Sequence, residues 1–272
     1  MSALQIDVKQ TMASKNKKLA KWLPHFIIRW IEKLIHQDEM NQFLAKYEHE
    51  NAIEFAQHTI TEFAQASITV IHEELIPKEG RYIVVSNHPL GAIDGLALIS
   101  LIGKYRTDIK FPVNDLLMAL KPMCSIFIPI NKHGRNSSDA ARELHNIFIS
   151  NNLVLYFPAG LCSRKINGKI QDLDWKKTII QKAVTYQRDI IPVFFEGKNS
   201  ERFYRIANWR KKLKIKTNLE MLLLPDEMIK QKGKKFTITF GKSISYTTFD
   251  SSKTHKEWAA WLREQSMSLA VL

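Results

Sequence analysis

The 272-residue sequence contains only two cysteines, Cys124 and Cys162. So few cysteines exclude a framework of disulfide bonds and favour a reducing compartment. No run of about 18 uncharged apolar residues is present, so we expect no membrane-spanning helix. The first residues are polar and no small-residue cleavage site follows them, so we expect no signal peptide. These absences favour a protein that is soluble or bound to a membrane only at its surface.

Several common site motifs are also absent. The sequence has no G-x-G-x-x-G, no G-x4-G-K-[ST], no G-x-S-x-G and no C-x-x-C. Dinucleotide binding, P-loop hydrolysis, α/β-hydrolase chemistry and a zinc knuckle therefore lack support from the sequence, and we expect no metal site.

Acidic residues are scarce relative to basic ones. The chain has 40 Lys and Arg against 27 Asp and Glu, a formal net charge of +13. Residues 1–36 carry seven cations against two acids, and residues 198–216 carry eight against one. Such an excess is typical of proteins that bind nucleic acid, an anionic membrane face or a phosphorylated ligand.

Both basic segments also carry large apolar residues. In the first segment these residues recur at the spacing of one helical face. Basic helices with tryptophan suit the headgroup level of an anionic bilayer, although a helix packed on the domain with solvated lysines fits the first segment equally well. The candidates for membrane contact are Trp22, Phe26, Trp30, Phe203, Trp209, Arg210 and Lys211.

Apolar periodicity predicts an α/β fold with a largely parallel central sheet flanked by helices, preceded by an N-terminal helical extension. We divide the chain into an amphipathic helical region, 1–66, and an α/β domain, 67–272. Residues 215–232 are ambiguous, since Ile215–Leu224 fits strand or helix, and Pro192 within a strand predicts an edge strand or a bend. The predicted strands are 68–72, 81–86, 109–113, 126–131, 153–157, 190–195 and 235–240, and the predicted helices of the α/β domain are 92–103, 137–150, 175–187, 201–213 and 255–267.

The segment Ser86-Asn87-His88-Pro89-Leu90-Gly91-Ala92-Ile93-Asp94-Gly95 follows one of these strands and precedes a helix. Pro89 and Gly91 permit a non-helical turn that brings Asp94 back against His88. A carboxylate on one imidazole nitrogen makes the other nitrogen a better base toward a hydroxyl. The pair by itself also fits an ordinary loop histidine and an aspartate at a helix start, and this plainer interpretation is the more frequent one.

Three further segments carry polar or special residues at strand ends. Tyr156-Phe157-Pro158-Ala159-Gly160 is a strand followed by a turn, and Ser163-Arg164-Lys165 comes just after it. Exposed backbone N–H groups and these cations fit phosphate binding, or a solvated loop. The other two segments are Phe127-Ile128-Pro129-Ile130-Asn131-Lys132, with Arg135 beyond it, and Ile190-Ile191-Pro192-Val193-Phe194-Phe195.

Taken in order, the four segments resemble the glycerophospholipid acyltransferase superfamily, which contains the lysophosphatidic acid acyltransferases. The resemblance covers roughly residues 68–200. Asn87-His88-Pro89, Asp94-Gly95 and Phe157-Pro158-Ala159-Gly160 are most similar to the hemolysin-like branch, which includes the O-acyltransferases of ornithine- and glycine-lipid synthesis. The sequence departs from the superfamily pattern in having five residues, not four, between His88 and Asp94, and Ala159-Gly160-Leu161-Cys162 where the pattern has Glu-Gly-Thr-Arg.

The resemblance implies transfer of a fatty acyl group from acyl carrier protein or coenzyme A to the hydroxyl of a lyso-lipid, without a cofactor. His88 would act as general base and Asp94 would orient it, beside an opening wide enough for a fatty chain. The departures leave open whether the acceptor is an aminolipid or the glycerol phosphate of phosphatidic acid synthesis. The residues implied in substrate binding are Asn87, Gly91, Asn131, Lys132, Arg135, Phe157, Pro158, Gly160, Ser163, Arg164 and Lys165.

The resemblance also implies a peripheral enzyme of lipid biosynthesis on the cytoplasmic side of the inner membrane. A thiol nucleophile at Cys162 is an alternative, although Cys is often a small buried apolar residue. A basic nucleic-acid-binding protein is an alternative of another class, because basic grooves with aromatic side chains bind single strands. No helix-turn-helix or RNP-type motif is evident, so we expect no nucleic-acid partner.

Overall fold

The computed structural model describes residues 6–15, 22, 24–130, 137–215 and 218–270. Its strands are β1 (Ser67–Ile71), β2 (Tyr82–Ser86), β3 (Ile109–Val113), β4 (Phe127–Pro129), β5 (Leu153–Tyr156), β6 (Arg164–Ile166), β7 (Lys169–Gln171), β8 (Asp189–Phe195) and β9 (Lys235–Phe240). Its α-helices are α1 (Val8–Lys15), α3 (His25–Leu34), α4 (Gln37–Lys46), α5 (Ala52–His58), α6 (Ile93–Ile102), α7 (Ser137–Ile149), α8 (Thr178–Tyr186), α9 (Glu201–Lys212), α10 (Leu224–Ile229) and α11 (His255–Met267).

The described strands form a seven-stranded sheet in the order β1-β9-β8-β2-β5-β3-β4. All neighbouring pairs are parallel except β8 and β9, so β1 and β9 run opposite to the other five strands. The predicted α/β fold with a largely parallel sheet is confirmed. In such sheets ligands bind outside the carboxyl ends of the strands, which is the edge that His88 occupies after β2.

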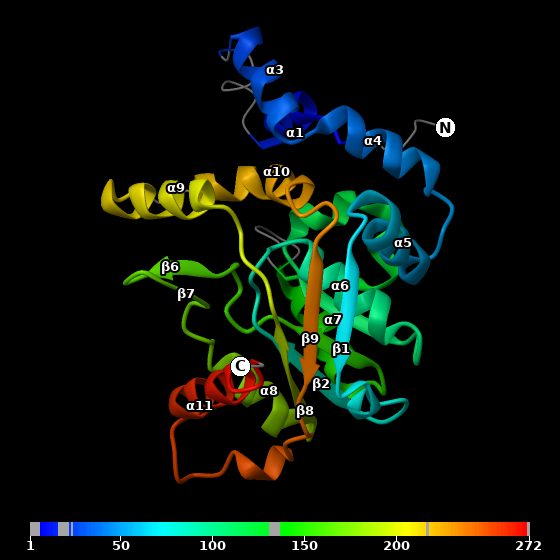
Figure 1. Ribbon diagram of the computed structural model, residues 1–272. Helices are drawn as coiled ribbons and strands as arrows, with labels where there is room; N and C mark the ends of the chain where they lie inside the picture. The colour runs from blue at the N-terminus through cyan, green and yellow to red at the C-terminus, as the bar shows by residue number, and fades with distance from the viewer. Residues whose placement is uncertain (1–5, 16–21, 23, 131–136, 216–217, 271–272) are drawn as a thin grey trace.

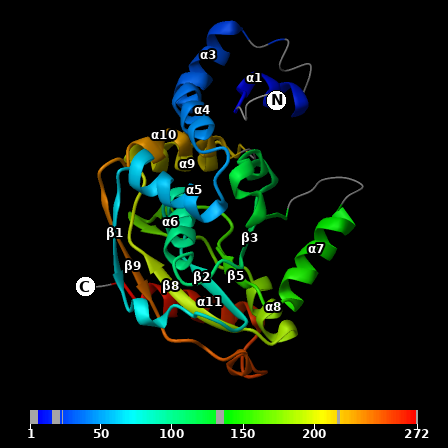
Figure 2. The ribbon, with the colours of Figure 1, turned by 90° about the vertical axis from the view of Figure 1, so that its right-hand side faces the viewer.

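Helices cover both faces of the sheet (Figure 2). Helices α5 and α6 pack on one face, where Phe55 and Ile99 belong to the same buried apolar cluster as Val84 of β2. Helices α7, α8 and α11 pack on the other face, where Ile180 and Leu262 are fully buried. A sheet with both faces covered requires near-continuous apolar strands, and β2, β5 and β8 have that composition.

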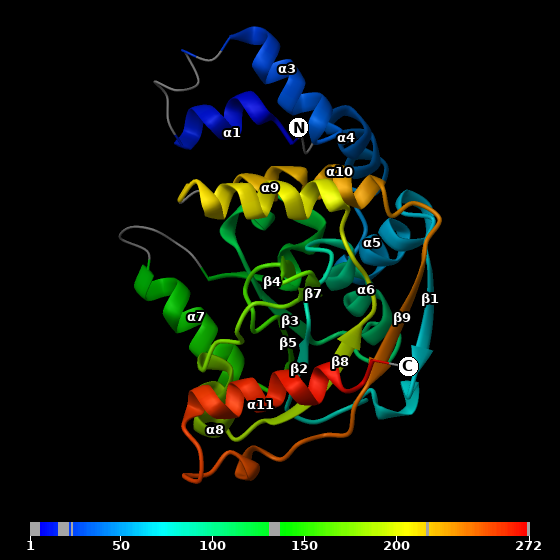
Figure 3. The same ribbon diagram turned by 60° about the vertical axis from the view of Figure 1, so that its left-hand side comes forward.

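The N-terminal helices α1, α3 and α4 lie over α9 and α10, at the end of the molecule toward which β8 runs (Figures 1 and 3). His36 Nε2 lies 3.1 Å from Asp226 Oδ1 of α10, and Lys232 pairs with Glu39 of α4. These contacts fix the N-terminal helices at the carboxyl edge of the parallel strands. The division of the chain at residue 66 stays a prediction.

Three local features differ from the sequence-based expectations or were not anticipated by them. The ambiguous segment 215–232 contains a short 3-10 helix, Leu219–Leu223, followed by α10. A two-stranded hairpin of β6 and β7 was not predicted. The edge-strand interpretation of Pro192 is wrong, because β8 lies between β9 and β2. Proline is tolerated there because the β8–β9 ladder covers only Val193–Phe195, so Pro192 needs no N–H toward β9.

A buried cation closes the opposite, amino end of the sheet. Arg188 is fully buried and donates hydrogen bonds to five main-chain carbonyl oxygens, including those of Phe148, Ser150 and Asn152. Carbonyl groups buried without a donor would destabilise the fold. Arg188 therefore stabilises the loop that joins α7 to β5 by donating hydrogen bonds to its carbonyl groups.

Candidate active site

The turn after β2 brings Asp94 against His88. Nδ1 of His88 lies 2.9 Å from Oδ2 of Asp94, so the predicted contact between the two side chains is present. The turn needs Gly91, whose φ of +87° is in the left-handed region that favours glycine. The N–H of Gly91 donates to Asp94 Oδ2 at 3.2 Å. Gly91 therefore accommodates the extra residue between His88 and Asp94.

Asp94 is completely buried and accepts hydrogen bonds from several donors. Leu90 N lies 2.9 Å from Oδ2, and Gly95 N lies 3.0 Å from Oδ1. Burial by itself would raise the pKa of Asp94, but the His88 imidazole and the N–H groups of the turn outweigh it and lower the pKa below its usual value. The carboxylate therefore stays ionised and stabilises positive charge on His88.

The main chain of His88 is held on both sides. Ser163 N donates to the His88 carbonyl at 2.7 Å, and His88 N donates to Asp172 Oδ1 at 3.2 Å. Asp172 also accepts from Ser163 Oγ at 2.6 Å and from Trp175 Nε1 at 3.0 Å. The imidazole ring stacks on Phe157, with ring centroids 4.0 Å apart. The segment Ser86–Gly95 and the segment Tyr156–Lys165 are therefore in contact around His88.

Asp172, which lies just after the β6–β7 hairpin, was not among the predicted site residues. A signal for that hairpin exists, because Asn167-Gly168 is a two-residue loop typical of hairpins. Both residues have positive φ, 49° and 78°, as a type I′ turn requires. Recognising this turn would have predicted that the chain returns beside Ser163.

The other predicted substrate-binding residues differ in their surroundings. The amide of Asn87 forms two hydrogen bonds with the main chain of Phe195, 2.9 and 2.7 Å long, so it ties β2 to β8. Pro158 is buried, whereas Gly160 is exposed with φ +70°. The predicted residues Asn131, Lys132 and Arg135 lie outside the described residues.

Arg164, which we predicted to bind substrate, is engaged inside the protein. Its side chain is 7% exposed, and its guanidinium donates to Glu220 Oε1 at 2.7 Å. Glu220 is itself fully buried, and Arg210 Nε lies 2.8 Å from its other oxygen as an ion pair rather than an aligned hydrogen bond. Lys165 pairs with Glu201 at 2.9 Å. Both cations predicted to bind a phosphate are therefore engaged with carboxylates.

The candidates for membrane contact fall into two groups. Trp22 is 87% exposed, Phe26 71%, Trp30 57% and Trp209 73%, and Lys211 is also exposed. Phe203 is fully buried on the inward face of α9, so the prediction of membrane contact is wrong for this residue. Arg210, on the same face, is mostly buried and paired with Glu220. No helix in the described ranges has the length and apolarity needed to cross a bilayer.

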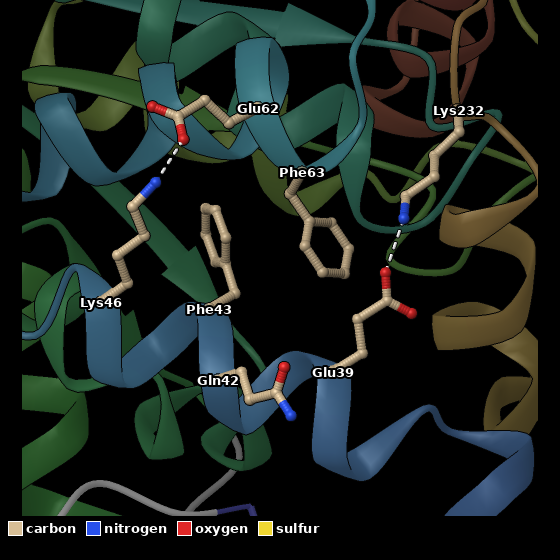
Figure 4. Close-up of a pocket in the computed structure, with 7 residues that line it drawn as sticks. All are labelled: Glu39, Gln42, Phe43, Lys46, Glu62, Phe63 and Lys232. Carbon is tan, nitrogen blue, oxygen red and sulfur yellow. Dashed lines mark hydrogen bonds and ion pairs between the residues drawn. The ribbon is translucent and has the colours of Figure 1, made fainter.

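Two of the cavities that the described residues form lie near the segments discussed above. One, of about 260 Å³, lies between α4 and the π-helical turn η1 (Thr59–Phe63), with Phe43 and Phe63 at its centre (Figure 4). Its four charged side chains pair with one another, Lys46 with Glu62 and Lys232 with Glu39. The other, of about 220 Å³, is lined by residues around the His88 turn, including Asn87, Pro89, Ser163 and Asp172. Neither is lined by His88 or Asp94, so the opening for a fatty chain stays a prediction.

The site also offers little to a metal ion. Across the described ranges, no three His, Cys, Asp or Glu side chains come together in a way that could hold one. The groups that the site offers for chemistry are the His88 imidazole, the Asp94 carboxylate and main-chain N–H groups.

Comparison with known proteins places this geometry in a family. The model of a family described as acyltransferase matches residues 10–271. This chain belongs to that acyltransferase family. It is 44% identical over 264 residues to a lyso-glycine lipid O-acyltransferase from Bacteroides thetaiotaomicron, with 97% of each chain covered. It is 41% identical to a protein of the same name from Phocaeicola vulgatus, with 97% of this chain and 94% of the relative covered.

A solved structure shares the fold. The 1-acyl-sn-glycerophosphate acyltransferase of Thermotoga maritima matches with a TM-score of 0.52 at 16% sequence identity, over 89% of this chain and 88% of the other. The chain is thus an acyltransferase, as the sequence motifs implied, and its sheet and helices have the architecture of a known acyltransferase structure.

In this acyltransferase the only cysteine near His88, Cys162, is fully buried. Burial raises the pKa of the Cys162 thiol to about 11, although the nearby Arg164 opposes the shift. A thiol with such a pKa is almost entirely protonated at pH 7, which disfavours the thiol-nucleophile alternative.

We expect Cys162→Ser to retain acyltransferase turnover within about threefold of wild type, because a general base needs no enzyme nucleophile. The measurement is the initial rate of acyl transfer, with Cys124→Ser as the matched control for loss of a thiol. A loss of more than about a hundredfold in Cys162→Ser alone, with the fold intact, would support the nucleophile instead.

Asp172 is expected to contribute strongly to stability, because its truncation leaves three donors around His88 without their acceptor. Asp172→Ala should lower the free energy of unfolding by at least about 3 kcal/mol. Asp174→Ala, an exposed position two residues away, should change it by less than about 0.5 kcal/mol. Urea unfolding measures both, and equal stability of the two variants would contradict this account of Asp172.

Proposed function

We propose that the chain is a lyso-lipid O-acyltransferase that transfers a fatty acyl group from an acyl thioester to the hydroxyl of a lyso-glycine lipid. The observation that carries this proposal is the 2.9 Å contact between His88 Nδ1 and the buried carboxylate of Asp94, at the carboxyl end of β2. The two relatives above 40% identity, both named lyso-glycine lipid O-acyltransferases, supply the acceptor class.

The geometry suits a general base. Because Nδ1 of His88 faces Asp94, Nε2 is the ring nitrogen left to accept a proton from the acceptor hydroxyl. The hydroxyl oxygen attacks the thioester carbon, and the tetrahedral intermediate expels the thiolate. The imidazolium then returns its proton to that sulfur. Asp94 stabilises the imidazolium in between, as a carboxylate does in a Ser-His-Asp triad.

The pairing of the loop cations argues for an acceptor other than a glycerol phosphate. A phosphate ester carries up to two negative charges and is commonly held by Arg in bidentate geometry. Arg164, the arginine closest in sequence to the Phe157–Gly160 turn, is instead buried against Glu220. The acceptor of this chain therefore needs less positive charge from the loop than phosphate does.

We further propose that the enzyme works at a membrane surface, because a lyso-lipid acceptor resides in the bilayer. The exposed Trp22, Phe26 and Trp30 of the N-terminal segment and the exposed Trp209 of α9 lie in the two basic segments. Apolar side chains among cations match the headgroup level of an anionic leaflet, and we assign the enzyme to its cytoplasmic face. Acyl carrier protein and coenzyme A are both suitable donors, and no cofactor takes part.

A reconstituted reaction tests the acceptor. Purified protein is incubated with acyl carrier protein or coenzyme A thioesters and either a lyso-glycine lipid or lysophosphatidic acid, and products are identified by mass spectrometry. We expect acylation of the lyso-glycine lipid. Acylation of lysophosphatidic acid alone would assign the enzyme to phosphatidic acid synthesis, and no acylation of either lipid would refute the proposal.

His88→Ala should lower kcat by about 10²–10⁴ while the protein stays folded, because removal of a general base typically costs that factor. Initial rates with a lyso-glycine lipid measure the effect, and the thermal unfolding midpoint checks the fold. His49→Ala, at a side chain 93% exposed, is the matched control and should be unchanged. Activity of His88→Ala within about threefold of wild type would reject the assignment.

Binding to vesicles with anionic lipid should weaken as salt is raised from about 0.05 to 0.5 M, because salt screens the exposed cations. Sedimentation with vesicles measures the bound fraction, and neutral vesicles are the control. The double variant Trp30→Ala, Trp209→Ala should lower binding at every salt concentration. Undetectable or salt-insensitive binding would remove the membrane part of the proposal, and strong tRNA binding on filters would favour the nucleic-acid alternative.

A further inference from the structure

A cavity of about 220 Å³ lies directly beside the His88 turn. Asn87 and Pro89, the residues before and after His88, both line it, and so do Ser163 and Asp172, which hold the His88 main chain. Ligand pockets for drug-sized molecules measure about 300–1,000 Å³. The smaller volume here suits a headgroup rather than a complete lyso-lipid with its fatty chain.

The lining of this cavity combines apolar side chains with polar ones, and it includes one cation. Ile170, Phe194 and Met267 contribute apolar surface, and Lys198 contributes the positive charge. Lys198 is exposed, and within the described residues it forms no ion pair with a carboxylate, although its charge contributes to lowering the pKa of the nearby Glu201 carboxyl. Four other cationic side chains at this end, Arg164, Lys165, Arg202 and Arg210, are each paired with a carboxylate.

The acidic group in the cavity does not cancel this charge. The Asp172 carboxylate already accepts hydrogen bonds from His88 N, Ser163 Oγ and Trp175 Nε1. The guanidinium of Arg263 lies against the same segment and donates to the Asp172 carbonyl at 2.6 Å and to Gln171 Oε1 at 3.2 Å. The Asp172 carboxylate thus has three hydrogen-bond donors of its own, and Lys198 remains available to an anionic ligand.

The position of Lys198 is fixed by its neighbours in the chain. Lys198 lies on the loop between β8 and α9, at the carboxyl edge of the sheet. Gly197 packs closely on Leu90, since a Cβ there would come within 3.2 Å of the Leu90 side chain. The buried amide of Asn199 donates to the carbonyls of Pro89 and Leu90, at 3.2 and 3.3 Å. The loop therefore places Lys198 at a set point relative to His88.

We infer that this cavity binds the carboxylate of the acceptor headgroup, with the Lys198 ammonium group as its counter-ion. The inference rests on the proposed function and specifies how the acceptor is chosen. A glycine headgroup joined to its fatty chain through nitrogen presents one carboxylate, which matches Lys198, the one cation among the described residues that line this cavity. A phosphate dianion would leave one charge without a partner in this cavity, so the site favours carboxylate acceptors over glycerol phosphates.

A paired substitution of protein and acceptor tests the inference. Wild type and Lys198→Ala are each assayed with a lyso-glycine lipid and with its glycinamide counterpart, in which a neutral primary amide replaces the carboxylate. With the acid, Lys198→Ala should raise KM about tenfold or more with kcat within about twofold, because a hydrogen bond to a charged group is lost. With the amide, the two proteins should have equal kcat/KM. Lys198→Arg should restore most of the loss, and Lys256→Ala, an exposed lysine of α11, should match wild type on both acceptors.

Two results would overturn the inference while leaving the proposed function in place. These are Lys198→Ala with wild-type kinetics on the acid, and Lys198→Ala with equal losses on acid and amide. A wild-type enzyme that acylates lysophosphatidic acid but neither glycine acceptor would overturn the proposed function and this inference together. Unfolding midpoints of all variants separate these outcomes from a folding defect.

Discussion

The site depends on one buried carboxylate that must have its hydrogen bonds satisfied. Asp94 is fully inaccessible to water, and an ionised carboxylate in that position is tolerated only if donors surround it. The donors are the His88 imidazole and the N–H groups of Leu90, Gly91 and Gly95. These bonds need the chain to turn back sharply between β2 and α6. The Asp94 carboxylate therefore fixes both the conformation of the turn and the orientation of the His88 imidazole.

A second carboxylate extends this arrangement across the sheet edge. Asp172 binds the main chain of His88, the hydroxyl of Ser163 and the indole of Trp175, and so joins the turn after β2 to the segments on either side of the β6–β7 hairpin. Residues on loops are catalytically useful only when a rigid scaffold holds them. Here the parallel strands supply the scaffold. The buried carboxylates of Asp94 and Asp172 hold the side chain and the main chain of His88 in a fixed position on it.

The apolar strands and the helix between β2 and β3 were predictable because their periodicity is strong. The predicted strands 109–113 and 235–240 and the predicted helix 255–267 coincide with β3, β9 and α11, and the other predicted elements differ from the observed ones by a few residues at most. The contact of His88 with Asp94 was also predictable, since Pro89 and Gly91 identify a turn. The hairpin was missed because its strands have three residues each and no clear alternation, although Asn167-Gly168 identifies its turn.

Side-chain partners could not be predicted from charge and composition alone. The sequence shows that Arg164 and Arg210 are cations, but only the fold shows that Glu220 lies buried between them. The burial of Phe203 could have been predicted from the helical spacing of residues in α9. Arg210 lies seven residues after Phe203, on the same inward face of α9, whereas Trp209 is offset from that face and exposed.

The Glu220 cluster also links two parts of the molecule that the proposed function needs together. Arg164 belongs to the segment that supports His88, and Arg210 belongs to α9, the helix that carries the exposed Trp209. A buried charge without its partner typically destabilises a protein by about 3–5 kcal/mol, so separating the two elements requires local unfolding. The helix that we assign to the bilayer surface and the loop beside the imidazole therefore form one rigid unit. The depth at which α9 docks would consequently set the height of His88 above the leaflet that holds the acceptor.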